Sequence, residues 1–354
     1  MRTYTLAMCS AWVTAVIATG QGQALRPPSP VEARRAIVEA FATHDLVAVS
    51  DPHGNMQVQA FILSLVRDPG FAAAVDDIVL ETASSRYQDA IDRFVRGDDV
   101  PRAVLRKAWD EHAVPTSTGV QADELVQAVR DVNRSLTGAR KLRLIAGDPP
   151  IDWDNVSSAQ EHRRWIELRD SYPADLIRRQ VLERGRRALV IYGQGHLQRR
   201  QIASNYDMST WQAQTVVSLL ERDTAARVFG VWTWLDRGVQ LPEAASWAVP
   251  SLAVVKETPL GARDFAVYAR GMDVGRFAVR DAELVPLPRD QWRTLRMDEQ
   301  FDAVLYLGDP SSMTFQGTLT ALCRDAQYVT ERIRRLTMAA PPFEVANFKK
   351  ACGV

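Results

Sequence analysis

The strongest constraint on this chain is an alternation of two kinds of segment. Four short, largely apolar runs are separated by longer amphipathic stretches. The runs are residues 46–50, 77–81, 142–146 and 188–192, and the helical stretches are residues 31–42, 57–65, 87–95, 122–136 and 158–183. Apolar runs of this length are typical of strands covered on both faces, and their alternation with helices indicates βαβ units. The sequence therefore predicts an α/β fold: a largely parallel or mixed central sheet with helices on both faces.

The C-terminal half continues this pattern less regularly. Strands are expected at residues 227–234, 251–256 and 301–307, and helices at residues 209–221 and 319–338, with long Pro-containing loops between them. Pro173 is expected to kink or split the helix at 158–183, because proline lacks the N–H of a helix interior. No change of composition marks a linker. We expect one α/β domain over residues 25–354, with core motifs at 46–200 and a decorated C-terminal half; two domains divided near Gln240 are the alternative.

The first 24 residues predict a cleaved export signal. Arg2 is a short basic region, residues 5–20 are almost uncharged and apolar, and Gly22-Gln23-Ala24 has the small-x-small pattern of a cleavage site. The apolar stretch is shorter than the about 20 residues that a membrane span needs, so no span is expected after cleavage. The mature chain should begin near Leu25 and be exported, to a periplasm or fully secreted. An uncleaved anchor is the alternative.

Signal removal takes Cys9 away and leaves Cys323 and Cys352. In an oxidising compartment these two would form one disulfide that ties the C-terminal tail to a preceding helix. Two unpaired cysteines, with Cys323 simply buried, are an equally open alternative.

Charge and composition narrow the partners. The 43 Lys and Arg balance the 43 Asp and Glu, so no net field attracts nucleic acid. The 46% hydrophobic and 24% charged residues are near the averages for globular proteins. We expect a small-molecule or peptide substrate and no nucleic acid. The sequence leaves the oligomeric state open.

Titratable residues directly follow four successive predicted strands. Because the carboxyl ends of parallel strands face one edge of a sheet, these residues should converge there. They are Asp51 and His53 after the first strand, Glu81 at the end of the second, Asp148 and Asp152 after the third, and His196 in Gly-x-Gly-His after the fourth.

Each of these residues also has a structural interpretation. His53, Asp148 and Asp152 could be turn residues, and Glu81 could cap a helix. His44, His112 and His162 have no strand-end setting and are expected at the surface. The Arg pairs at 178–179, 186–187 and 199–200 are expected on solvated faces, with Arg199 near enough to His196 to reach an anionic group.

Several mechanisms lack their signatures. The sequence has no Gly-x-Ser-x-Gly elbow, no His-Glu-x-x-His, no phosphate-binding P-loop and no Gly-x-Gly-x-x-Gly after a strand. The remaining chemistry is a His and carboxylate site that either activates water as a general base or holds a divalent metal. The metal ligands would be His53, Glu81 and His196.

Four short motifs together resemble one superfamily. They are Asp51-Pro52-His53 at the end of one strand, Glu81 at the end of the next, Arg169-Asp170 in a helix, and Gly193-Gln194-Gly195-His196. This set is similar to the superfamily of erythromycin esterase-like proteins, Tiki and TraB proteins, and ChaN-like haem-uptake proteins, over residues 46–200. The resemblance implies the fold of these proteins.

The resemblance also implies roles for the matched residues. His53 would be a general base or ligand with Asp51 and Glu81 as its partners. Arg169 would be an oxyanion or carboxylate clamp, and His196 the second imidazole. The family's first strand ends in Gly-Glu-x-His or Gly-Glu-x-x-His, whereas this chain has Ser50 and Asp51. The shorter carboxylate is drawn back by about 1.5 Å, and such a displacement can alter or abolish activity.

Members of this superfamily hydrolyse esters without a metal, cleave proteins with a metal, or bind haem, so the fold does not choose the reaction. Three hypotheses follow. The first is an exported hydrolase of an ester or amide, in which His53 activates water, Asp51 and Glu81 orient it, and Arg169 with His196 stabilises the oxyanion. The second is a carrier of haem or another metal complex, with His53 or His196 as axial ligand and Trp and Tyr side chains as its walls. The third is a catalytically inactive relative. The cofactor is therefore open: none, a divalent metal or haem.

Overall fold

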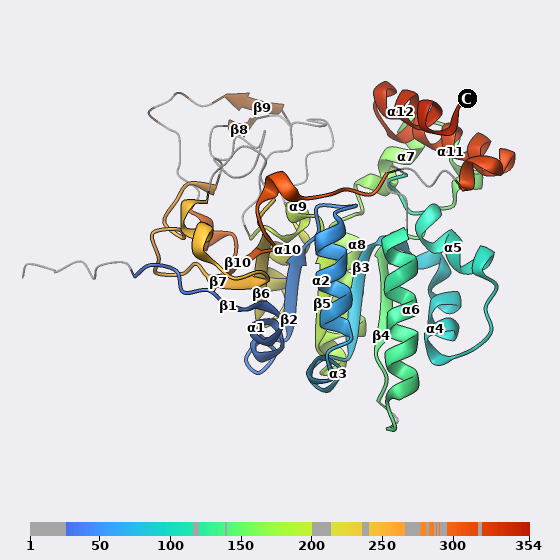
Figure 1. Ribbon diagram of the computed structural model, residues 1–354. Coiled ribbons are helices and arrows are strands. Elements are labelled where there is room, and N and C mark those ends of the chain that lie inside the picture. The colour runs from blue at the N-terminus through green and yellow to red at the C-terminus, as the bar shows by residue number, and fades with distance from the viewer. Residues whose placement is uncertain are drawn as a thin grey trace, which may run out of the picture.

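The centre of the protein is an eight-stranded mixed sheet, seen in a computed structural model (Figure 1). The structure describes residues 26–115, 120–138, 140–199, 214–235, 241–265, 277–280, 283–286, 288, 290, 296–317 and 321–354. The predicted signal at 1–24 lies outside these residues. In spatial order the strands are β1 (Val31–Glu32), β7 (Ser251–Val254), β10 (Ala303–Tyr306), β6 (Val228–Thr233), β2 (Leu46–Ser50), β5 (Ala188–Tyr192), β3 (Asp77–Ser84) and β4 (Arg143–Asp148). A separate two-stranded sheet pairs β8 (Phe277–Arg280) with β9 (Glu283–Pro286).

Most of the sheet is parallel. β10, β6, β2, β5, β3 and β4 pair in parallel along the sheet, and β7 pairs antiparallel with β10 and β1. The predicted α/β fold with a largely parallel or mixed sheet is confirmed. β2 and β5 have the predicted bounds, and β7 and β10, which lie beyond residue 240, join the same sheet as the N-terminal strands.

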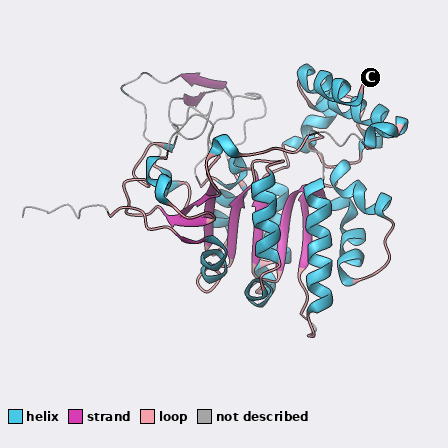
Figure 2. Cartoon of the chain, in the orientation of Figure 1, coloured by secondary structure: helices cyan, strands magenta, loops and turns pink. Residues whose placement is uncertain are grey.

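Alternate residues of the strands face two separate cores. Val47 and Val49 of β2 belong to the core under α1 to α6, whereas Leu46 and Ala48 belong to the core under α8 and α10. Helices therefore cover both faces, as predicted, and they flank the strands in Figure 2. The helices are α1 (Ala33–Ala40), α2 (Met56–Val66), α3 (Pro69–Ala74), α4 (Gln88–Arg96), α5 (Arg102–Asp110), α6 (Val120–Ser135), α7 (Ala159–Ile166), α8 (Ser171–Gln180), α9 (Gln194–Leu197), α10 (Val216–Asp223), α11 (Ala326–Ala339) and α12 (Pro342–Cys352).

The long helix predicted at residues 158–183 is two helices, and the break is not at Pro173. α7 ends at Ile166 and α8 begins at Ser171, so Pro173 lies in the first turn of α8. A proline is tolerated there because the first N–H groups of a helix have no partner inside it. Arg169 and Asp170 occupy the turn between the two helices, and this turn brings their side chains to the end of the sheet.

The C-terminal end adds a helical hairpin that the sequence predicted only in part. The predicted helix at 319–338 corresponds to α11. No prediction covered α12, which begins at Pro342. Cys323 and Cys352 form a disulfide between the segment before α11 and the end of α12. The predicted helix at 209–221 overlaps α10, and its part at 209–213 lies outside the described residues. Among the described residues, no helix is both long enough and apolar enough to cross a membrane.

Candidate active site

The turn after β2 presents an exposed imidazole. His53 has φ 52° and Gly54 has φ 77°, so two consecutive residues adopt the left-handed conformation. The Asp51 carboxylate holds this turn: Oδ1 accepts the His53 backbone N–H at 3.0 Å, and Oδ2 lies 3.4 Å from His53 Nδ1. The His53 side chain is 42% exposed, so it is open to a substrate.

Glu81 lies at the centre of the site, buried in β3. Its Oε2 accepts the Gly193 N–H and lies 3.6 Å from His53 Nε2. Its Oε1 accepts a hydrogen bond from Arg169 Nη2 and lies 3.5 Å from His196 Nε2. Burial alone would raise the pKa of Glu81, but the charges of His53, Arg169 and His196 outweigh it and hold this pKa well below its usual range. Glu81 is therefore an anion between two imidazoles.

The two imidazoles are held in the same way. Each turns Nε2 toward Glu81 and Nδ1 toward an aspartate, which is Asp51 for His53 and Asp170 for His196, the latter at 2.8 Å. Burial opposes protonation of His53, but Glu81 and then Asp51 raise its pKa to about 9. Burial likewise opposes protonation of His196, and Asp170 with Glu81 raises the pKa of that ring. The His53 ring therefore favours the protonated form near neutral pH.

Arg169 bridges two buried carboxylates of the chain itself. Its Nε donates to Asp148 Oδ1 at 3.1 Å, while Nη2 donates to Glu81. Asp148 Oδ2 accepts the Ala113 N–H at 2.6 Å. Burial raises the pKa of Asp148 to about 6, and Arg169 opposes that rise. Of the two predicted roles for Arg169, the geometry fits the carboxylate clamp, because two of its donors are used inside the protein.

Two glycines permit the close approach of these groups. A Cβ on Gly193 would lie 3.2 Å from His53 Nε2 and 3.4 Å from Glu81 Oε2. A Cβ on Gly147 would lie 1.9 Å from the Tyr192 hydroxyl. Any side chain at Gly147 would therefore displace Tyr192, whose ring contacts His196 edge-on with centroids 6.0 Å apart.

Ser50, which stands where the superfamily pattern has Gly, has a structural role. Its Oγ accepts the Thr233 N–H at 2.7 Å, and its carbonyl accepts the Thr233 hydroxyl at 2.6 Å. These bonds fasten the end of β2 to β6. The Ser50 side chain thus helps to hold the end of the strand that precedes Asp51 and His53.

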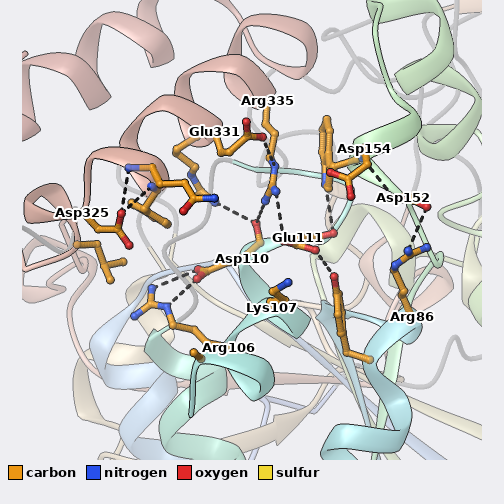
Figure 3. A pocket seen from close by; sticks show the side chains of 17 residues that line it. Arg86, Arg106, Lys107, Asp110, Glu111, Asp152, Asp154, Asp325, Glu331 and Arg335 are labelled. Atoms are coloured by element: carbon orange, nitrogen blue, oxygen red, sulfur yellow. Dashed lines mark hydrogen bonds and ion pairs between the residues drawn. The ribbon is translucent and has the colours of Figure 1, made fainter. Parts of the chain in front are cut away.

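Asp152 does not join the site. Its carboxylate accepts the Asp154 N–H at 3.3 Å and pairs with Arg86 at 3.0 Å. Asp152 and Arg86 line a neighbouring hollow, which lies between the segments after β3 and β4 and the helices α5 and α11 (Figure 3). The other predicted site residues are brought together at the end of the sheet, whereas Asp152 caps a local turn. The residues of the cluster are Asp51, His53, Glu81, Asp148, Arg169, Asp170 and His196.

His112 and His162 were expected at the surface, and both are buried. His112 is 1% exposed and accepts the Val114 N–H on Nδ1 at 3.1 Å. Burial, with Arg169 and Arg332 nearby, holds the pKa of His112 well below its usual range, so this ring stays neutral next to the site. No strand-end signal marks it, because it reaches the site from the loop after α5. His162 Nε2 lies 2.7 Å from the Ala113 carbonyl oxygen and stacks on Trp153.

Two arginines expected on solvated faces form partly buried pairs. Arg199 pairs with Glu221 at 2.9 Å and Asp302 at 2.6 Å, so it serves these acids and not an anion near His196. Arg186 pairs at 2.7 Å with Asp77, which is fully buried at the start of β3.

The proposed metal ligands do not fit a metal ion here. Arg169 and the Gly193 N–H occupy both oxygens of Glu81, and a guanidinium beside that carboxylate disfavours a second cation. Over the part of the chain that the structure describes, no group of three or more His, Cys, Asp or Glu side chains is arranged to hold a metal.

Haem does not fit the neighbouring hollow either. Charged side chains make up most of its lining, and a large apolar ring there would remove them from water without offering them hydrogen bonds. Trp109 and Trp232, two of the tryptophans that could have formed apolar walls, are instead buried in the hydrophobic cores.

Comparison with known proteins gives a likeness of fold. The sequence matches no protein-family model and no curated protein. Solved structures similar to this chain include an erythromycin esterase, EreC, in its open conformation (11% identity, TM-score 0.48, 80% of this chain and 94% of that one). They also include haem-binding ChaN of Campylobacter jejuni (11%, 0.38, 59% and 88%) and a Bacillus cereus protein (10%, 0.48, 79% and 94%). An erythromycin esterase and a ChaN protein, two of the kinds of protein that the motifs resemble, are thus among the similar structures. At these identities the likeness concerns the fold, and the reaction must be argued from this chain's own residues.

Proposed function

We propose that this protein is an exported hydrolase that cleaves an ester or amide bond with water activated by His53. The observation that carries the proposal is the position of His53 Nε2, 3.6 Å from Glu81 Oε2 on a partly exposed ring. A water molecule held between these atoms would donate one hydrogen to each, which leaves an oxygen lone pair for attack on a carbonyl carbon. Asp51 fixes the ring through Nδ1.

The protonation states determine how such a site works. His53 must lose its proton to act as a base, and its pKa of about 9 places that step at alkaline pH. After taking a proton from water, His53 can return it to the leaving group. His196 Nε2 lies 3.5 Å from Glu81 Oε1, and Arg169 keeps Glu81 anionic and in place.

Export is supported by two features of the chain. The N-terminal sequence has the pattern of a cleaved signal, and Cys323–Cys352 is a disulfide, which persists in oxidising compartments. Both features support a periplasmic or secreted location.

The test is hydrolysis by His53→Asn. Asn tolerates the left-handed backbone at this position, so the turn should survive the change. We expect turnover of p-nitrophenyl acetate, p-nitrophenyl butyrate and alanine p-nitroanilide to fall by roughly 10² to 10⁴, the usual share of a general base. The melting temperature should stay within about 4 °C of the wild type.

His44→Asn is the matched control, because His44 contacts the Ala40 carbonyl oxygen and the Phe229 ring, away from the cluster. It should keep wild-type turnover. A fully active His53→Asn protein would overturn the proposal.

A further inference from the structure

A hollow of about 830 Å³ is built over the ends of β3 and β4 (Figure 3). Arg86 and Tyr87 follow β3, and Asp152 to Asp154 follow β4; α5 and α11 supply the other walls. This volume is within the range of small-molecule sites, roughly 300 to 1,000 Å³. Two of the segments that line the hollow thus continue the strands that carry Glu81 and Asp148.

A short backbone segment connects the hollow to the candidate active site. The Glu111 carbonyl oxygen, on the hollow side, accepts Trp153 Nε1 at 3.2 Å. Two residues later, the Ala113 N–H donates to Asp148, which Arg169 holds. A ligand in the hollow would therefore lie next to the groups that fix Glu81.

Ion pairs inside the hollow neutralise most of its charges. They are Arg106 with Asp110 at 2.6 Å, Arg86 with Asp152 at 3.0 Å and Arg335 with Glu111 at 3.2 Å. Lys107 and Asp154 are different: both side chains are exposed, and among the described residues neither has an ion pair or a side-chain hydrogen bond. Figure 3 shows them on separate walls, with Lys107 on α5 and Asp154 on the segment after β4.

Unpaired charges of opposite sign on two walls of one polar hollow match a ligand that carries both charges. We propose that the hollow binds a zwitterionic, peptide-like ligand, whose carboxylate meets Lys107 and whose ammonium group meets Asp154. The identity of this ligand as the substrate rests on the proposed hydrolase function, whereas its binding does not.

The test is calorimetric titration of the full-length mature protein with trialanine, N-acetyl-trialanine and trialanine amide. The wild type should bind trialanine about fivefold more tightly than either blocked form, the effect of one partly exposed ion pair. Lys107→Gln should abolish the preference over the amide and keep the preference over the acetylated peptide. Asp154→Asn should do the reverse. Lys256→Gln, an exposed lysine beyond β7, should change neither preference.

Two results would overturn the inference. One is the absence of trialanine binding up to roughly 10 mM, the affinity expected of two weak ion pairs. The other is unchanged preferences in both variants. His53→Asn should bind all three peptides like the wild type. If the charge preferences hold and the wild type hydrolyses no ester or amide, the hydrolase proposal fails and the binding site stands.

Discussion

Replacing Arg169 with Met tests whether this guanidinium holds the site together. Its side chain is 14% exposed and lies between Glu81 and Asp148, both buried. Removing one partner of a buried ion pair destabilises a protein by about 3–5 kcal/mol, because the remaining charges lose their counterion. With Arg169 in place the pKa of Asp148 is already raised from 3.8 to about 6, so ionising this buried carboxyl costs about 3 kcal/mol, and that cost grows when the guanidinium is removed.

The pH dependence of that loss follows from the sign of the shift. A carboxyl whose pKa is raised in the folded state destabilises the protein above that pKa, and the effect is relieved as pH falls from about 6 to 3.8 and the folded protein takes up the proton first. Arg169→Met should raise the pKa of Asp148 further. The loss of unfolding free energy in Arg169→Met, relative to the wild type, should therefore be larger at pH 8 than at pH 5.

Urea unfolding followed by Trp fluorescence at both pH values measures this deficit. The double variant Arg169→Met/Asp148→Asn should recover part of the stability, because one buried charge is gone. Arg178→Met is the matched control, because Arg178 pairs with the exposed Asp175 and Glu183. This variant should lose less than about 1 kcal/mol of unfolding free energy. A deficit for Arg169→Met below about 1 kcal/mol, or one equal at the two pH values, would refute the reasoning.

Three further predictions concern other parts of the structure. Hydrolysis by the wild type should rise about tenfold per pH unit up to about pH 9 and then level off, since His53 must be neutral; a rate independent of pH between 6 and 9 contradicts this. Gly147→Ala should destabilise the protein by about 1–3 kcal/mol through its clash with the Tyr192 hydroxyl, and added Tyr192→Phe should recover part of that in thermal unfolding. Reducing Cys323–Cys352, which closes a loop with a sequence separation of 29, should lower the stability of the α11–α12 hairpin by about 3–4 kcal/mol, seen as faster hydrogen exchange there.

The sheet was predictable because its signals are local. The runs at 46–50 and 188–192 coincide with β2 and β5. Short apolar, β-branched segments are typical of strands that are buried between two layers of helices. The start of α7 also has a local signal: Ser158 and Glu161 have the spacing of a capping box, and Ser158 Oγ accepts the Glu161 N–H at 3.2 Å. The break before α8 was placed wrongly because proline at the start of a helix and proline inside one look alike in sequence.

The approximate place of the site was predictable for the same reason, but its contacts were not. Strand ends located Asp51, Glu81 and His196, because parallel strands must end at one edge. Their neighbours come from far along the chain: Arg169 and Glu81 are separated by 88 residues. No local pattern sets such a distance. Asp152 shows the limit, since it follows the same strand as Asp148 and yet turns to Arg86.

The sequence by itself determined the approximate positions of β2 to β7 and β10, and which acids and imidazoles follow the strands. Those properties depend on the side chains of a few consecutive residues. Only the tertiary structure decided that Glu81 lies between two imidazoles, that Arg169 serves Asp148, and that His112 is buried and neutral. Burial and charge separation depend on how distant segments pack, and a carboxylate's pKa is fixed by those distances and not by its neighbours in sequence.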